Sequence, residues 1–132
     1  MTNIVLDTNI IISAALSPNG NPAKILSLTA NENDMQIYYA MEILEEYKEV
    51  LSRPRMNIDA KTQICILNAI TKTGILIVPS PSNIPMLDET DRIFYDTAKA
   101  SNSILITGNT KHYPVEPFIM TPTEFLNEKR DT

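Results

Sequence analysis

Short, uninterrupted apolar runs recur along this chain, and stretches with helical periodicity separate them. Continuous rather than alternating apolar runs are typical of strands that are buried on both faces of a parallel sheet. The runs cover residues 3–6, 36–39, 75–78, 104–106 and 118–120. This alternation predicts an α/β fold: a three-layer α/β/α sandwich with a central parallel five-stranded sheet.

The helices are expected in the segments between these strands. Asn21-Pro22 matches an N-cap followed by proline at the first helical position, and Gly74 matches the residue just beyond a helix end. Thr121-Pro122-Thr123-Glu124 matches a capping box that opens a terminal helix. The helices before this terminal one are expected at residues 9–16, 21–30, 41–51, 59–73 and 88–101. Since no repeat or long linker divides the chain, residues 1–132 are expected to form one domain.

The composition is typical of a soluble protein from a reducing, cytoplasmic compartment. With 132 residues and 43% apolar content, the chain can bury a core without disulfides. The only cysteine, Cys65, cannot form an internal disulfide, and its Cys-Ile-Leu context predicts packing in the core. Asp7 interrupts the first apolar stretch, which has no basic segment before it and is therefore not a signal peptide. No apolar run approaches the roughly 20 residues that a membrane span needs.

The formal net charge of −5 leaves the class of partner open. Nucleic-acid binding normally requires an excess of lysine and arginine, which argues against such a partner. Acidic residues can, however, hold divalent cations, which then supply the positive charge that phosphate requires. Net acidity also simply favours solubility. The charge alone therefore does not decide the function.

Polar residues follow two of the predicted strands. Open parallel sheets bind ligands beyond the carboxyl ends of their strands, near the switch in strand order. Asp7-Thr8-Asn9 follows the first strand, and Thr107-Gly108-Asn109 follows the fourth. Asp7 suits a cation ligand, but it could equally cap the next helix through its carboxylate. A Gly-Asn pair alone is more often just a turn.

Asp91 is the sharpest single indication of a reactive site. Helical geometry places it on the same side as Phe94, Tyr95 and Ala98, which is the core face. A buried carboxylate is costly unless it is paired or coordinates a metal, so we interpret Asp91 as functional. Asp88, at the start of this helix, is interpreted as its N-cap.

The remaining candidates are less distinct. Glu45 and Glu46 flank the apolar stripe of helix 41–51 on opposite edges, and periodicity does not distinguish between them. His112 is the only histidine, and we expect it to be exposed rather than catalytic because no nucleophile is evident for it to activate.

Carboxylates that converge at one end of a parallel sheet make a hard, oxygen-rich site. Mg²⁺ or Mn²⁺ suits such a site, whereas the lack of Cys/His clusters disfavours zinc. These ions activate water and neutralise charge on a phosphodiester. Each carboxylate would act mainly as a ligand, and one of them could orient the attacking water or accept its proton.

Four segments of the chain, in this order and spacing, resemble one known family. They are Val5-Leu6-Asp7-Thr8-Asn9-Ile10; Glu42-Ile43-Leu44-Glu45-Glu46-Tyr47 with Val50-Leu51-Ser52-Arg53-Pro54; Asp88-Glu89-Thr90-Asp91-Arg92-Ile93-Phe94 with Ala98; and Leu105-Ile106-Thr107-Gly108-Asn109. The ordered set, which spans nearly the whole chain, is similar to the PIN-domain family. More narrowly, it resembles the toxin components of bacterial toxin–antitoxin pairs (VapC-like).

The resemblance implies a metal-dependent ribonuclease with Mg²⁺ or Mn²⁺ held by Asp7, Glu46 and Asp91, and it thereby selects Glu46 over Glu45. Asn109 stands where many PIN nucleases have a fourth acid, so it would be a weaker ligand, and one-metal and two-metal chemistry both stay open. The resemblance also implies an RNA substrate, a homodimer or higher homo-oligomer, and an antitoxin that blocks the site. Residues expected to support the site are Thr8, Asn9 and Thr107.

Three other classes of protein share some of these features. A receiver-like signalling domain would need a phosphoacceptor Asp at the end of the third strand, which instead ends Val78-Pro79-Ser80. A dehalogenase-type phosphatase would need Asp at position 9, where this chain has Asn. A catalytically silent PIN-like scaffold that acts only through protein contacts would bind metal without cleaving RNA.

Overall fold

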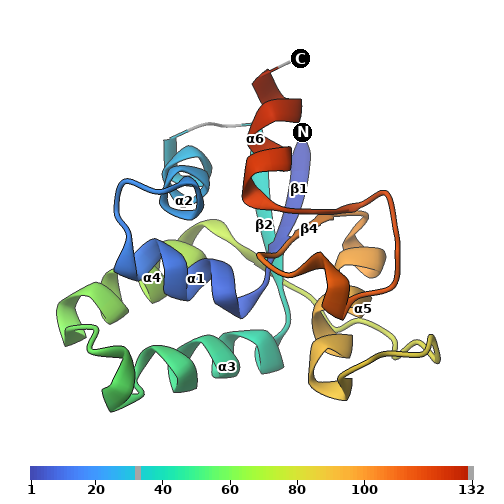
Figure 1. The fold of residues 1–132 in the computed structure, drawn as a ribbon, viewed down its shortest axis with the longest axis horizontal. Helices are drawn as coiled ribbons and strands as arrows, with labels where there is room; N and C mark the ends of the chain where they lie inside the picture. The colour runs from blue at the N-terminus through green and yellow to red at the C-terminus, as the bar shows by residue number, and fades with distance from the viewer. Residues whose placement is uncertain (32–33, 131–132) are drawn as a thin grey trace.

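Strands and helices alternate along the part of the chain that the structure, a computed structural model, describes: residues 1–31 and 34–130 (Figure 1). The strands are β1 (Thr2–Leu6), β2 (Met35–Tyr39), β3 (Ile75–Leu76), β4 (Ile104–Ile106) and β5 (Ile119–Met120). The α-helices are α1 (Thr8–Leu16), α2 (Asn21–Asn31), α3 (Met41–Leu51), α4 (Ala60–Thr73), α5 (Arg92–Ser101) and α6 (Pro122–Arg130). Three single-turn 3₁₀ helices are η1 (Pro54–Met56), η2 (Glu89–Asp91) and η3 (Thr110–His112).

The strands form one parallel sheet in the order β3-β2-β1-β4-β5. Helix α5 packs on β1, β2 and β4 from one side of the sheet (Figure 1). On the other side, α2 and α4 contact β2, and α1 packs against these two helices. The predicted three-layer α/β/α architecture with a five-stranded parallel sheet is therefore confirmed. The strand order reverses between β1 and β4, so a crevice is expected where these two strands end.

Helix ends follow the capping signals of the sequence. In the predicted capping box at the start of α6, Thr121 N–H donates to Glu124 Oε1 (2.9 Å) and Glu124 N–H donates to Thr121 Oγ1 (3.2 Å). At the start of α4, Asp59 is the N-cap, and its Oδ1 accepts from Thr62 N–H (3.0 Å). These two helices begin where the sequence placed them, to within one residue.

The prediction of a buried third strand over residues 75–78 was wrong. The strand β3 covers only Ile75 and Leu76, which are 43% and 47% exposed, and Val78 is 95% exposed. The physical reason is position: β3 is the edge strand and pairs only with β2, so half of its surroundings is solvent. A continuous apolar run does not reveal whether its strand is central or at an edge.

Gly74 ends α4, but the prediction that it would act as a C′ glycine was wrong in its mechanism. Its backbone is extended (φ −87°, ψ 157°) rather than left-handed. What requires glycine is space, because a Cβ here would lie 2.5 Å from the carbonyl oxygen of Ile70 and 2.8 Å from the Tyr39 ring. The left-handed helix ends belong instead to Asn57 and Asn102.

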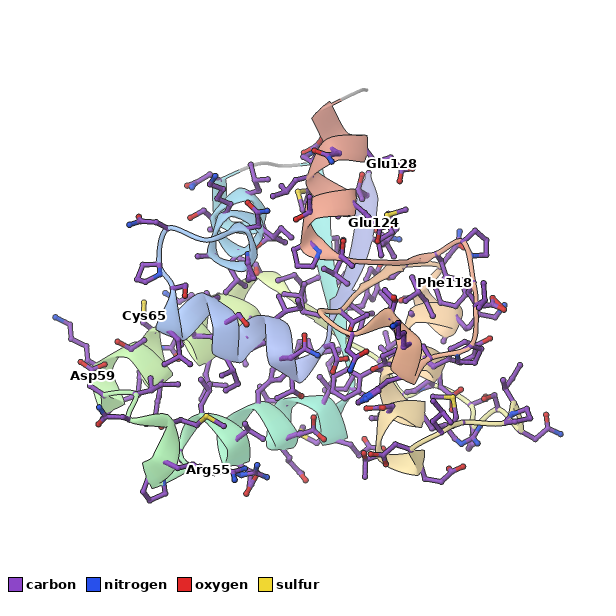
Figure 2. All side chains as sticks on the ribbon, in the orientation of Figure 1. Arg55, Asp59, Cys65, Phe118, Glu124 and Glu128 are labelled. Carbon is purple, nitrogen blue, oxygen red and sulfur yellow. The ribbon has the colours of Figure 1, made fainter. Side chains whose placement is uncertain are left out.

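Cys65 does not pack in the core, contrary to the prediction. It is exposed on α4 (Figure 2), and so is Ile64 beside it. In α4 the fully buried position is Ile70, because this helix packs on α1, α2, α3 and β2 with a narrow stripe. A cysteine among apolar neighbours was therefore not a reliable sign of burial.

The predicted helix over residues 88–101 also begins differently. Its first turn is the 3₁₀ helix η2, and regular α-helix starts only at Arg92. The side chain of Asp88 caps this turn by accepting from the N–H of Thr90 (3.0 Å), which confirms the capping interpretation.

Within the described residues, no helix is long and apolar enough to cross a membrane.

Candidate active site

Asp7 lies at the switch point of the sheet, directly after β1. The register pairs Leu6 with Ile106, so the next residues, Asp7 and Thr107, leave neighbouring strands side by side. The backbone N–H of Asp7 continues the ladder by donating to Ile106 O (3.0 Å). These two buried side chains therefore lie at the position where the topology predicts a crevice.

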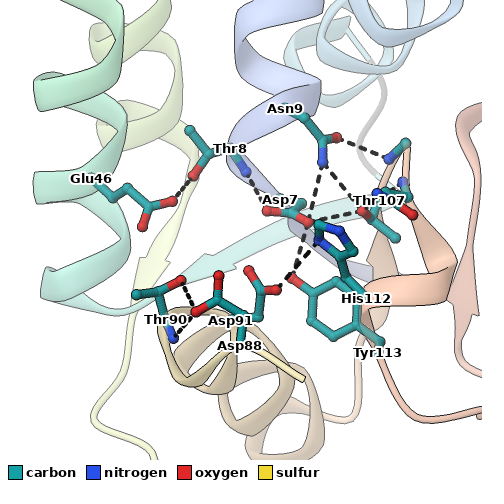
Figure 3. Close-up of polar contacts among 12 residues, drawn as sticks. Asp7, Thr8, Asn9, Glu46, Asp88, Thr90, Asp91, Thr107, His112 and Tyr113 are labelled. Carbon is teal, nitrogen blue, oxygen red and sulfur yellow. Dashed lines mark hydrogen bonds and ion pairs between the residues drawn. The ribbon is translucent and has the colours of Figure 1, made fainter. Parts of the chain in front are cut away.

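Four residues donate hydrogen bonds to the Asp7 carboxylate (Figure 3). Asp7 Oδ1 accepts from the N–H of Thr8 (2.8 Å), so Asp7 is also the N-cap of α1. Its Oδ2 accepts from three donors: Thr107 Oγ1 (2.8 Å), Tyr113 Oη (2.9 Å) and Asn9 Nδ2 (3.3 Å). Capping and a place in the site, which the sequence left as alternatives, thus occur together in Asp7.

The hydroxyl of Thr107 has a fixed direction. It accepts from the Asn9 side chain (3.4 Å) and from the N–H of Asn109 (3.1 Å), so its single hydrogen points to Asp7. Asn9 Oδ1 in turn accepts from the N–H of Gly108 (2.9 Å). A Cβ at Gly108 would lie only 3.2 Å from that oxygen, so glycine allows the close approach of the two loops.

Asp91 lies opposite Asp7, at the junction of η2 and α5 (Figure 3). Its side chain is 16% exposed, and its Oδ2 is buried without a hydrogen-bond partner among the described residues. Burial raises the pKa of the Asp91 carboxyl to about 6, and the negative charges of Asp7 and Asp88 add to the rise. A buried carboxylate oxygen that accepts no hydrogen bond, on a group with a raised pKa, is a feature of functional sites.

Glu46 reaches the same region from α3, whereas Glu45 is exposed. The hydroxyl of Thr8 donates to Glu46 Oε2 while the N–H of Thr8 donates to Asp7, so Thr8 links the two acids (Figure 3). The neighbouring Tyr47 is fully buried, and its hydroxyl donates to the carbonyl of Leu6. This contact fixes the rotation of α3 against the end of β1.

Two residues that were not among the predicted site residues complete the site. Tyr113 is 5% exposed and donates to Asp7, and burial together with the charge of Asp7 raises the pKa of its phenol far above the usual value. His112 is 56% exposed, as expected, yet its Nδ1 lies 3.7 Å from Asp91 Oδ2. Both lie in the loop between β4 and β5, which has no periodicity that could have signalled them.

Asn109, the predicted fourth ligand, is exposed. Its backbone N–H donates to Thr107 and its carbonyl accepts from the N–H of His112 (3.2 Å). Across the described ranges, no hydrogen bond joins its side-chain amide to the acids. Its role as a ligand stays a prediction.

Arg92 and Asp96 tie the proline-rich segment before η2 to α5. Arg92 donates to the carbonyl and hydroxyl of Ser82 (2.9 and 3.1 Å) and forms a two-point ion pair with Glu89. The buried Asp96 accepts from the N–H of Ser82 (3.1 Å). Because Glu89 belongs to the turn that ends in Asp91, this network holds that turn in place.

The oxygens of this site suit a hard divalent cation. The charge of Asp7 contributes to the raised pKa of Asp91, so the two carboxylates lie near each other, and Asp91 Oδ2 accepts no hydrogen bond from the described residues. In residues 1–31 and 34–130, no three Asp, Glu, His or Cys side chains are arranged to enclose an ion. The two aspartates are therefore the residues that would hold the cation. Glu46 is linked to Asp7 indirectly, because Thr8 donates to both acids.

Known proteins share this architecture. A family model of the PIN domain matches residues 3–111. The "Uncharacterized protein MJ1680" of Methanocaldococcus jannaschii is 31% identical, over 95% of this chain and 90% of that protein. A chain in the crystal structure of VapBC2 from Rickettsia felis bound to a DNA fragment from their promoter has the same fold, with a TM-score of 0.62 and 18% identity over 91% of this chain and 97% of that chain. The chain therefore belongs to the PIN-domain family.

Proposed function

We propose that this protein is a Mg²⁺- or Mn²⁺-dependent ribonuclease that hydrolyses RNA phosphodiester bonds at the site of Asp7, Glu46 and Asp91. One observation carries the proposal: a buried carboxylate oxygen without a hydrogen bond, Asp91 Oδ2, lies across from Asp7, whose Oδ2 is fully hydrogen-bonded, at the switch point of the sheet (Figure 3). The fold alone does not identify the chemistry, and the support comes from these side chains.

Each acid has a separate role in this proposal. Asp7 and Asp91 would hold the cation, and Glu46 would join them or orient the attacking water from the α3 side. A divalent cation at such a site supplies positive charge for the phosphodiester and lowers the pKa of water enough to provide a nucleophile. Asp91 Oδ2, which accepts no other hydrogen bond in the described structure, is the atom assigned to receive the cation or the proton of the attacking water.

The RNA backbone would approach past the exposed loop between β4 and β5. His112 lies beside Asp91, and the exposed Lys111 precedes it in the same turn, so this loop carries two positively ionisable groups. Such groups position phosphates in a chain whose net charge is otherwise negative. The cation then supplies the remaining attraction.

The biological role that we infer is that of a toxin controlled by an antitoxin protein. The support is the shared fold with a chain of the VapBC2 complex, together with the motifs that resemble VapC-like toxins. A cytoplasmic location and a homodimer belong to the same proposal. A small protein encoded beside this chain that binds it and inhibits its cleavage of RNA would support the role.

The catalytic proposal is tested by incubating purified protein with labelled RNA and Mg²⁺ or Mn²⁺. We expect cleavage by the wild type, loss of cleavage in Asp7→Asn and Asp91→Asn, and loss on chelation with EDTA. Asp59→Asn is the matched control, because Asp59 is an exposed cap at the far end of α4 and its variant should cleave normally. Equal cleavage by all four proteins would point to a contaminating nuclease. Metal binding without any cleavage would instead select the silent scaffold.

A further inference from the structure

We propose that Tyr113 is a positioning residue that fixes the orientation of the Asp7 carboxylate and directs its Oδ1 toward the cation. The proposal rests on the proposed function, because it assumes that Asp7 is a metal ligand. It adds a residue that the sequence motifs did not include, and it assigns the ligating oxygen.

The two oxygens of Asp7 differ in how many hydrogen bonds they accept. Oδ2 accepts from Thr107, Tyr113 and Asn9, whereas Oδ1 accepts only from the N–H of Thr8. A carboxylate offers about four acceptor sites in all, two on each oxygen. Oδ2 is therefore fully used, and Oδ1 is the oxygen that retains capacity for a cation.

Tyr113 donates one of the two short hydrogen bonds that occupy Asp7 Oδ2 and leave Oδ1 available. The Tyr113 hydroxyl lies 2.9 Å from Oδ2 and the Thr107 hydroxyl 2.8 Å, while the exposed Asn9 is more distant at 3.3 Å. The Tyr113 ring is buried in the hydrophobic core, so its hydroxyl is delivered by a side chain that cannot move freely. A donor on a rigid, buried ring restricts rotation of the carboxylate more than a donor on an exposed amide does.

The position of Tyr113 in the chain makes it more than an isolated donor. It follows η3 directly, and the last residue of η3, His112, lies 3.7 Å from Asp91 Oδ2. Consecutive residues of one turn thus contact both aspartates, which come from different elements of the fold. The turn consequently fixes the placement of Asp7 relative to Asp91.

The direct test compares Mn²⁺ binding by wild type and Tyr113→Phe, measured in the absence of RNA by electron paramagnetic resonance of the free ion. Loss of an outer-shell partner typically weakens metal binding by about 10–100-fold, and we expect a rise of that order in the Mn²⁺ dissociation constant. Tyr95→Phe is the matched control. It removes another buried tyrosine hydroxyl, on α5 against Phe118, and should bind Mn²⁺ like the wild type.

A second measurement separates positioning from a general loss of structure. If Tyr113 only stabilises the fold, Tyr113→Phe will melt earlier without metal but will bind Mn²⁺ normally at low temperature, and the proposal is overturned. If Tyr113 positions Asp7, raising the Mg²⁺ concentration will restore the cleavage rate of the variant toward that of the wild type. A cleavage rate that stays low at saturating Mg²⁺ would also contradict it.

The wild type itself gives a readout that does not depend on the variant folding. The ring carbon that bears the Tyr113 hydroxyl should shift in the NMR spectrum as Mg²⁺ is added, and it should saturate at the concentration that supports cleavage. A Tyr113 signal that stays constant while Mg²⁺ binds would overturn the inference and leave the proposed function intact. Wild type that binds no Mn²⁺ at all would contradict the proposed function as well.

Discussion

The hydroxyl of Thr107 donates to Asp7 Oδ2 over 2.8 Å and joins two residues that lie 100 positions apart in the sequence. Parallel pairing of β1 with β4 produces this contact, because Leu6 and Ile106 are register partners and the next residue of each strand enters the crevice. The same hydroxyl accepts from Asn9 and from the N–H of Asn109, so one side chain connects the turn between β1 and α1 with the loop after β4.

Thr107→Val should therefore weaken both the fold and the site. The variant leaves the buried Asp7 with one donor fewer, and hydrogen bonds to charged groups contribute about 1.5–3 kcal/mol. We expect a loss of that order in the free energy of unfolding, measured by urea denaturation, and weaker binding of Mn²⁺. Thr107→Ser keeps the hydroxyl and should retain most of both properties. Equal losses in the two variants would show that the methyl packing, and not the hydrogen bond, matters.

Neutralising Asp91 should stabilise the metal-free protein at neutral pH. The pKa of Asp91 is raised from 3.8 to about 6 in the folded state, so its ionised form is disfavoured there relative to the unfolded chain. The stability that the protonated group contributes is complete below pH 3.8 and is lost as the pH rises through 6. Above pH 6, Asp91→Asn should be more stable than the wild type by roughly 1–3 kcal/mol in EDTA, with the difference closing near pH 4.

Adding Mg²⁺ provides the control for this prediction. The cation should raise the melting temperature of the wild type and leave that of Asp91→Asn almost unchanged, because a ligand stabilises only the form that binds it. If the wild type and the variant have the same stability at pH 8 as well as at pH 4, the ionised form of Asp91 is not disfavoured in the folded protein.

Replacing Arg92 by lysine should loosen the segment before η2. Lysine keeps the charge but cannot donate at once to Ser82 and in two-point fashion to Glu89. Hydrogen exchange at the Ser82 N–H should accelerate, and RNA cleavage should fall because the turn that carries Asp91 loses its support. The control is Arg53→Lys, which breaks a similar but exposed pair with Glu49 and should affect neither measurement.

Gly74→Ala should destabilise the protein without harming the site. The added Cβ would lie 2.5 Å from the Ile70 carbonyl and 2.8 Å from the Tyr39 ring, and relieving such overlap typically costs about 1–3 kcal/mol. Gly20→Ala is the control, since the nearest atom to its Cβ would be 3.4 Å away. Thermal unfolding should separate the two variants, while the folded fraction of each should cleave RNA at the wild-type rate.

The sequence predicted those features that depend on local pattern. Strand order brings Asp7 and Thr107 together, and both were identifiable because polar residues that follow apolar strands stand out. Glu46 was different: periodicity left it equivalent to Glu45, and only the family resemblance selected it. In the structure, it is Glu46 that contacts Thr8.

What the sequence did not reveal depends on tertiary contacts. Tyr113 and His112 lie in an aperiodic loop, so nothing local indicates that they contact Asp7 and Asp91. The exposure of β3 follows from its being the edge strand, and strand order cannot be read from apolar content. The exposure of Cys65 follows from the narrow buried stripe of α4. Such features require knowing which elements are neighbours.

The central claim is that Asp7 and Asp91 together bind one divalent cation. Anomalous diffraction from crystals soaked in Mn²⁺ tests it most directly, because the ion is located independently of activity. The account predicts a single strong peak about 2 Å from Asp7 Oδ1 and from a carboxylate oxygen of Asp91. A peak elsewhere, or none at saturating Mn²⁺ with both side chains in place, would contradict it.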